Sequence, residues 1–131
     1  MGPSNSSAEP VRVLFLISEI DPLIKIGGLG DVGGSLPPAL KALQESRRFS
    51  RDLDLRVIIP FYPQLRQQNI TSHLVSEFSI DRSGVKVNAR VYQSTLGNIP
   101  IYLIDGNPVA NDSLVYSSNP LLNGEKFTFY S

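Results

Sequence analysis

Apolar and polar positions in the first sixty residues predict a strand, a helix and a second strand. Residues 11–17 and 55–60 are short apolar runs rich in β-branched side chains, with little alternation. Such runs are typical of strands buried on both faces of a parallel sheet. Between them lie four apolar residues at the i, i+3, i+4, i+7 spacing of a one-sided helix, namely Leu36, Ala39, Leu40 and Leu43. This order predicts a βαβ unit with a right-handed crossover.

Two adjacent prolines, Pro37 and Pro38, bear on where this helix begins. Proline is tolerated in the first turn of a helix and disfavoured further inside it. We therefore expect a short glycine-rich turn, then a break or kink, and then a helix that begins near Ser35. Serine is a good N-cap residue, and a proline close behind it suits the first turn.

The pattern changes to alternation in the second half of the chain. Residues 74–81 and 85–93 alternate apolar with polar side chains, and Arg82-Ser83-Gly84 lies between them. This arrangement predicts an antiparallel hairpin with one solvated face. A third apolar strand is predicted at 99–104. After it we expect a loop over 107–124 and the first turns of another helix over 125–131.

Composition narrows the classes of function. The 131 residues are enough for one domain, 41% of them are hydrophobic, and the formal net charge is zero. A neutral chain lacks the basic character typical of nucleic-acid-binding domains. There is no cysteine, and the one histidine, His73, is expected at the surface, so no metal site is predicted. No apolar run reaches the roughly 18 residues of a membrane span. Residues 1–10 are polar and lack the apolar core of a signal peptide, so we expect a flexible lead-in there.

The segment 25–32, Lys-Ile-Gly-Gly-Leu-Gly-Asp-Val, is the strongest candidate for chemistry. It follows the first strand and leads into a helix, whose N-terminus offers free N–H groups and partial positive charge to an anion. Glycines allow close approach of a ligand, and Lys25 adds a full charge. The competing interpretation is a tight turn beside a solvated lysine. A dinucleotide fingerprint at Gly28, Gly30 and Gly33 is also formally present, but no acidic residue ends the second strand to hold a ribose.

A longer pattern includes this segment. Residues 18–32 resemble the signature Ser-Glu-x-x-Pro-x-x-Lys-x-Gly-Gly-Leu-Gly-Asp-Val of bacterial glycogen synthases and plant or cyanobacterial starch synthases. Weaker matches continue it at 34–37, 56–60, 62–63, 101–105 and 124–127. The resemblance covers nearly everything from Val11 onward. It implies an α/β fold: the Rossmann-like N-terminal domain of a two-domain GT-B glycosyltransferase, with the hairpin as an insertion. Residues 11–131 would be an incomplete, truncated form of that domain.

The resemblance also implies a reaction. Enzymes of this family transfer glucose from ADP-glucose, or UDP-glucose in some relatives, to the non-reducing end of an α-1,4-glucan with retention of configuration. Their active site lies between two domains, so this chain would hold one wall and lack its C-terminal domain. We expect it to be inactive alone, with no catalytic residue of its own and no cofactor. The alternative is a glucan- or nucleotide-binding module without catalysis. The implied compartment is the bacterial cytoplasm or the plastid stroma.

Five residues carry the implied substrate contacts. Lys25 would bind the sugar nucleotide, and Gly27 and Gly28 would bring backbone N–H groups toward the phosphates or glucose. Asp31 would either contact substrate or balance the partial positive charge of the helix N-terminus. Glu19 would either contact a ligand or shape the loop.

Overall fold

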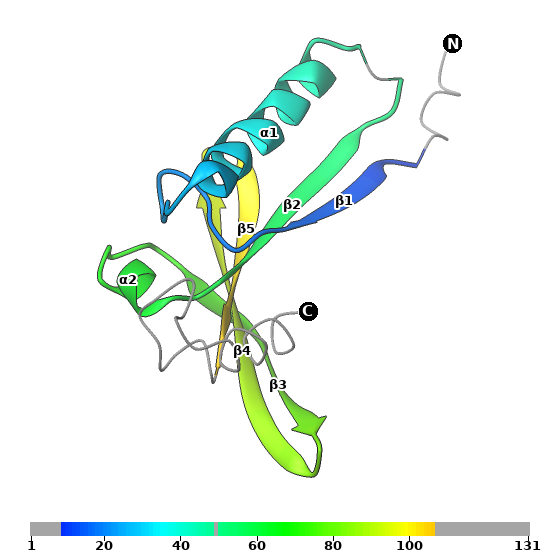
Figure 1. Cartoon of the computed structure of the whole chain (residues 1–131). Helices are drawn as coiled ribbons and strands as arrows, with labels where there is room; N and C mark the ends of the chain where they lie inside the picture. Colours follow the sequence, from blue (N-terminus) through cyan, green and yellow to red (C-terminus); the bar gives the residue numbers. More distant parts are fainter. Residues whose placement is uncertain (1–8, 49, 107–131) are drawn as a thin grey trace.

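The computed structural model describes residues 9–48 and 50–106, and these residues form one five-stranded sheet (Figure 1). The elements are β1 (Val11–Leu16), α1 (Gly28–Glu45), β2 (Leu53–Pro60), α2 (Pro63–Arg66), β3 (His73–Arg82), β4 (Val85–Leu96) and β5 (Ile99–Asp105). The strand order is β1-β2-β5-β4-β3. Strands β1, β2 and β5 are parallel, whereas β4 is antiparallel to β5 and to β3. The predicted α/β fold with a hairpin is confirmed.

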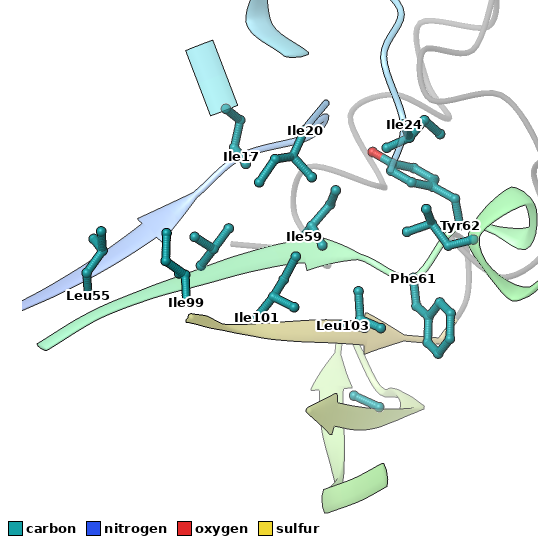
Figure 2. Close-up of a cluster of buried hydrophobic side chains, with 13 residues drawn as sticks. Ile17, Ile20, Ile24, Leu55, Ile59, Phe61, Tyr62, Ile99, Ile101 and Leu103 are labelled. Atoms are coloured by element: carbon teal, nitrogen blue, oxygen red, sulfur yellow. The ribbon is translucent and has the colours of Figure 1, made fainter. Parts of the chain in front are cut away.

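The core lies between one face of the parallel strands and the loop that follows β1 (Figure 2). Strand β2 contributes Leu55, Val57 and Ile59, and β5 contributes every second residue in the same way, with Ile99, Ile101 and Leu103. The loop contributes three isoleucines that cover these strands: Ile17, Ile20 and Ile24. Period-two burial on neighbouring strands therefore gives a single apolar surface, and the loop after β1 is part of the core.

Only one face of the parallel strands is covered by the described residues. Leu14 and Leu16 on β1 are 54% and 48% exposed, and Arg56 on β2 is exposed as well. The prediction that these strands are buried on both faces is therefore wrong for this part of the chain. The reason is that one long helix, α1, is the only crossover helix among these residues, and it covers one side.

The hairpin is confirmed, and it extends away from the parallel part of the sheet (Figure 1). Its two-residue turn holds Ser83 at φ 53° and Gly84 at φ 83°. Both values lie in the left-handed region, as a two-residue turn matched to strand twist requires. One face is polar, and there Arg90 pairs with Glu77 at 3.1 Å. The apolar face is partly solvated too, since Phe78 and Val85 are 45% and 63% exposed, so the prediction of one solvated face holds only in part. Exposed His73 begins β3, which agrees with its predicted surface position.

The predicted start of the helix is wrong. Helix α1 begins at Gly28, with Gly27 as N-cap, and continues through Pro37 and Pro38 to Glu45. Ser35 does not cap it; its hydroxyl donates to the carbonyl of Asp31 at 2.7 Å. Tertiary packing keeps the helix continuous, because its buried face is made of small or rigid residues one or two turns apart, namely Gly30, Gly33 and Pro37.

Several predictions concern parts of the chain outside the described residues. These are most of the lead-in over 1–10, the loop over 107–124 and the helical turns over 125–131.

Candidate functional site

The loop between β1 and α1 is closed on itself and anchored to the core. Ile20 and Ile24 exchange two backbone hydrogen bonds of 2.9 Å each, which closes a turn around the cis Asp21–Pro22 peptide bond. The buried Tyr62 hydroxyl donates to the carbonyl of Ser18 at 2.8 Å. The segment that precedes α1 therefore has a fixed path at the carboxyl end of β1, the edge where ligands bind in open α/β sheets.

The N-terminus of α1 is capped by Glu19, a residue from the loop. Its carboxylate accepts hydrogen bonds from the N–H groups of Ile26 at 2.9 Å, Gly27 at 3.2 Å and Gly30 at 2.8 Å. Glu19 is 1% exposed. These hydrogen bonds are of the kind expected for the loop-shaping role, one of the two roles predicted for this residue. Sequence reasoning missed that a carboxylate seven to eleven residues earlier would satisfy these donors, because the contact depends on how the loop folds back.

Three glycines in the first two turns of α1, namely Gly30, Gly33 and Gly34, are explained by close packing. A β-carbon on Gly30 would lie 2.9 Å from Cγ of Lys25. One on Gly33 would lie 2.7 Å from the carbonyl oxygen of Glu19, and one on Gly34 would lie 2.6 Å from that of Asp21. Contacts under 3.0 Å cannot be accommodated without a shift of the neighbouring atoms. These glycines therefore let α1 lie directly against the loop.

Gly27 and Gly28 are different, because packing does not require them to be glycine. A β-carbon on Gly28 would meet nothing within 4 Å, and one on Gly27 would touch only a carboxylate oxygen of Glu19 at 4.0 Å. The N–H of Gly27 already donates to Glu19. Within the described part of the chain, the N–H groups of Gly28 and Leu29 have no hydrogen-bond partner. These are ordinary orphan donors of a helix first turn.

Lys25 and Asp31 form an ion pair at the mouth of the loop, with 2.6 Å between Nζ and Oδ1. Both side chains are exposed, at 45% and 59%. The hydrogen bond that the Lys25 ammonium donates to Asp31 raises the pKa of Lys25 above its ordinary value, and the charges of Asp31, Asp21 and Glu19 act in the same direction. Lys25 is therefore a protonated, accessible cation, and Asp31 is both a first-turn acid and its partner.

A second charged cluster, missed by sequence reasoning, lies at the carboxyl ends of β2 and β5. Arg66 pairs with Asp105 at 2.6 Å, and its guanidinium lies over the ring of Phe61 at 4.2 Å. Phe61 in turn meets Tyr92 edge to face, with 5.4 Å between ring centroids. A lone arginine in a four-residue helix carries no sequence signal of this kind. The cluster ties α2 to the end of β5.

Neither a metal-binding cluster nor a helix able to span a membrane is present in residues 9–48 and 50–106. These residues contain no group of three or more His, Cys, Asp or Glu side chains that could hold a metal ion. Neither α1 nor α2 combines the length and apolar character that a membrane span requires.

Comparison with known proteins places this geometry in a family. The chain is 33% identical over 126 residues to the glycogen synthase of Photobacterium profundum and 38% identical over 124 residues to that of Vibrio parahaemolyticus. These matches cover 93% and 92% of this chain, but 23% and 24% of the relatives, so the chain spans about a quarter of their length.

A solved structure and a family profile agree with these relatives. The catalytic domain of starch synthase IV from Arabidopsis thaliana, bound to ADP and acarbose, superposes with a TM-score of 0.65 at 19% identity. The superposition covers 86% of this chain and 22% of that one, and it supports the GT-B fold. Residues 12–131 match the profile described as starch synthase catalytic domain. These matches run along almost the whole chain and include the glycine-rich entrance to α1 and the strands of the sheet. The protein is therefore a member of the starch synthase catalytic domain family.

Proposed function

We propose that this chain is the donor-side part of a hexosyltransferase that moves glucose from ADP-glucose to an α-1,4-glucan with retention. The observation that carries the proposal is the entrance of α1. There an exposed lysine and a glycine with open space around it stand together at the carboxyl end of β1. The glycogen synthase relatives and the ADP- and acarbose-bound starch synthase support this substrate class.

We assign the backbone contact with the diphosphate to Gly28. Its N–H is unpartnered among the described residues, and the space around it would allow a ligand to approach closely. Gly27 would only leave space for the ligand, because its N–H already donates to Glu19. Lys25 would supply the positive charge, and Asp31 would hold its ammonium in place until substrate competes for it.

The charges around the loop support our proposal that the 131-residue chain does not transfer glucose alone. The negative charges of three carboxylates, Asp31 in direct contact and Asp21 and Glu19 farther away, act on the one ammonium of Lys25. Two or three charge-assisted hydrogen bonds contribute about 3–9 kcal/mol. Association costs an estimated 4–15 kcal/mol. We therefore expect millimolar affinity or weaker, with the remaining positive charge supplied by a C-terminal domain across the cleft. The compartment we propose is the bacterial cytoplasm or the plastid stroma.

Ligand titration of the ¹⁵N-labelled chain tests this proposal. We expect ADP-glucose to shift the amide signals of Lys25 to Asp31 at millimolar concentration, and Lys25→Met to remove that response. Lys86→Met, at an exposed lysine on β4, is the matched control and should leave it unchanged. Shifts with a maltooligosaccharide alone would favour the glucan-binding module instead.

An activity assay tests the second half of the proposal. Incubating the purified chain with radiolabelled ADP-glucose and glycogen should give no elongated glucan. Measurable incorporation would contradict the proposed dependence on a second domain.

A further inference from the structure

We propose that Glu19 is a positioning residue: its buried carboxylate is a permanent internal anion that fixes the backbone from Ile26 to Gly30. In doing so it decides which N–H groups of the entrance to α1 are left for a substrate. This deepens the proposed function and rests on it for the contact at Gly28: there Glu19 only occupies the N–H of Gly27 and adds negative charge near Lys25, whereas here it positions the whole entrance.

The three N–H groups form an anion-binding site, and the anion bound there is the carboxylate of Glu19 itself. Oε2 accepts from Ile26, and Oε1 accepts from both Gly27 and Gly30. Gly27 is the N-cap and Gly30 lies in the first turn, so the carboxylate joins the loop to the helix. One side chain thus fixes three consecutive parts of the segment: the residue before the cap, the cap and the first turn.

The charge of Glu19 is balanced by the backbone. The residue is 1% exposed, and within the described residues no cation lies at ion-pair distance from it, because Lys25 pairs with Asp31. A buried carboxylate is stable only where hydrogen bonds compensate for lost hydration. Here three N–H donors do so, aided by the partial positive charge at the N-terminus of α1. The same interactions mean that these donors cannot serve a ligand phosphate while Glu19 is in place.

The consequence is a selection among the backbone donors. With Ile26, Gly27 and Gly30 taken, Gly28 and Leu29 in the first turn of α1 keep N–H groups that have no partner in the described part of the chain. Glutamine cannot reproduce this arrangement. Its side chain has one accepting oxygen, and its NH₂ group would face a backbone N–H, donor against donor.

The first experiment compares Glu19→Gln with Glu45→Gln, the same change at an exposed position at the other end of α1. We expect the amide proton signals of Ile26, Gly27 and Gly30 to move upfield in Glu19→Gln and to stay in place in Glu45→Gln. Unchanged signals for these three residues in Glu19→Gln would overturn the proposal, because the hydrogen bonds it rests on would not exist in solution.

The second experiment is rescue by an external anion. Glu19→Ala removes the carboxylate and leaves its donors unpaired, so sodium formate should raise its melting temperature in a saturable way. Sodium chloride of equal ionic strength should not, and the native chain should respond equally to both salts. Equal responses of Glu19→Ala to formate and chloride would contradict the internal-anion role. If Glu19→Ala does not fold even in formate, the amide shifts of Glu19→Gln decide.

A third measurement separates positioning from simple stabilisation. In folded Glu19→Gln, the response of the Gly28 amide to ADP-glucose should be lost or reduced several-fold, while signals of β2 and β5 keep their native positions. A native-sized response at Gly28 would contradict the positioning role. If the native chain itself gives no response to ADP-glucose, the proposed function fails, and the shift and formate experiments still test Glu19.

Discussion

Gly30 and Lys25 are packed so closely that no side chain fits between them. A β-carbon on Gly30 would lie 2.9 Å from Cγ of Lys25 and 3.2 Å from its Cα. The stem of Lys25 therefore crosses the first turn of α1, which places its ammonium 2.6 Å from Asp31. A glycine inside the helix thus determines where the cation of the site lies.

Gly30→Ala should disturb this arrangement. Overpacking lowers the free energy of unfolding by about 1–3 kcal/mol. Replacing a glycine inside a helix by alanine raises it by up to about 1 kcal/mol. We expect the free energy of unfolding to fall by about 0–2 kcal/mol, measured by urea denaturation. The Lys25 side-chain NMR signals should shift as well. Native Lys25 signals in Gly30→Ala would contradict the packing argument.

Gly28→Ala is the matched change two residues earlier. Because a β-carbon there meets nothing within 4 Å, stability should be unchanged or raised by up to about 1 kcal/mol. The amide response to ADP-glucose should weaken, since the methyl group would occupy the space assigned to the ligand. A loss of stability as large as in Gly30→Ala would show that Gly28 is also required by packing.

Asp31→Asn should lower the pKa of Lys25 toward its ordinary value of 10.5, because the hydrogen bond that Lys25 donates to the Asp31 carboxylate is the main cause of the raised pKa. A folded-state pKa above the unfolded value gives a contribution to stability that is fully present below pH 10.5. It is lost as the pH rises through the folded pKa. At neutral pH it is therefore complete, and salt screens it since the pair is exposed. NMR titration of the Lys25 side chain in both proteins checks the direction, and an equal or higher pKa in Asp31→Asn would contradict it.

Arg66→Met should lower the free energy of unfolding by about 1–3 kcal/mol, because it leaves the carboxylate of Asp105 at the end of β5, only 14% exposed, without its cation. The Oδ1 atom of Asp105 is already buried without a hydrogen-bond partner. Adding Asp105→Asn removes the unpaired charge, so the double variant should be more stable than Arg66→Met alone. Urea denaturation of the single and the double variant tests this. If the double variant is less stable than Arg66→Met, the two substitutions act independently and the pairing of Arg66 with Asp105 is contradicted.

Pro38→Ala should stabilise α1. Pro38 is exposed and lies inside the helix, where it cannot donate to the carbonyl four residues earlier. Alanine is favoured over proline by about 3 kcal/mol in a helix interior. The alanine variant is also more flexible when unfolded, which lowers this gain in stability by up to about 1 kcal/mol. Because the native helix already accommodates the ring, we expect a net gain of about 1–2 kcal/mol. Pro37→Ala is the control and should not gain as much, because Pro37 is buried and its packing would be lost.

Much of the fold was predictable because its signals are local. The runs that became β1, β2 and β5 are short and β-branched, and the hairpin strands alternate around a Ser-Gly turn. Each of these patterns lies within one strand or turn. The start of α1 was not predictable in this way. Local rules disfavour prolines in the third turn of a helix, and the packing that overrides those rules comes from Glu19 and Asp21 in the loop.

The sequence by itself determined the strands, the hairpin, the glycine-rich segment and the identity of the cation, Lys25. Only the tertiary structure decided how the glycines are used. Gly30, Gly33 and Gly34 serve close packing, Gly27 donates to Glu19, and Gly28 alone keeps both open space and an unpartnered N–H among the described residues. The physical reason is that the residue type sets which backbone conformations a position can adopt and which hydrogen bonds it can donate. Which donors remain for a ligand depends on contacts between residues up to eleven positions apart, made only when the loop folds over the helix.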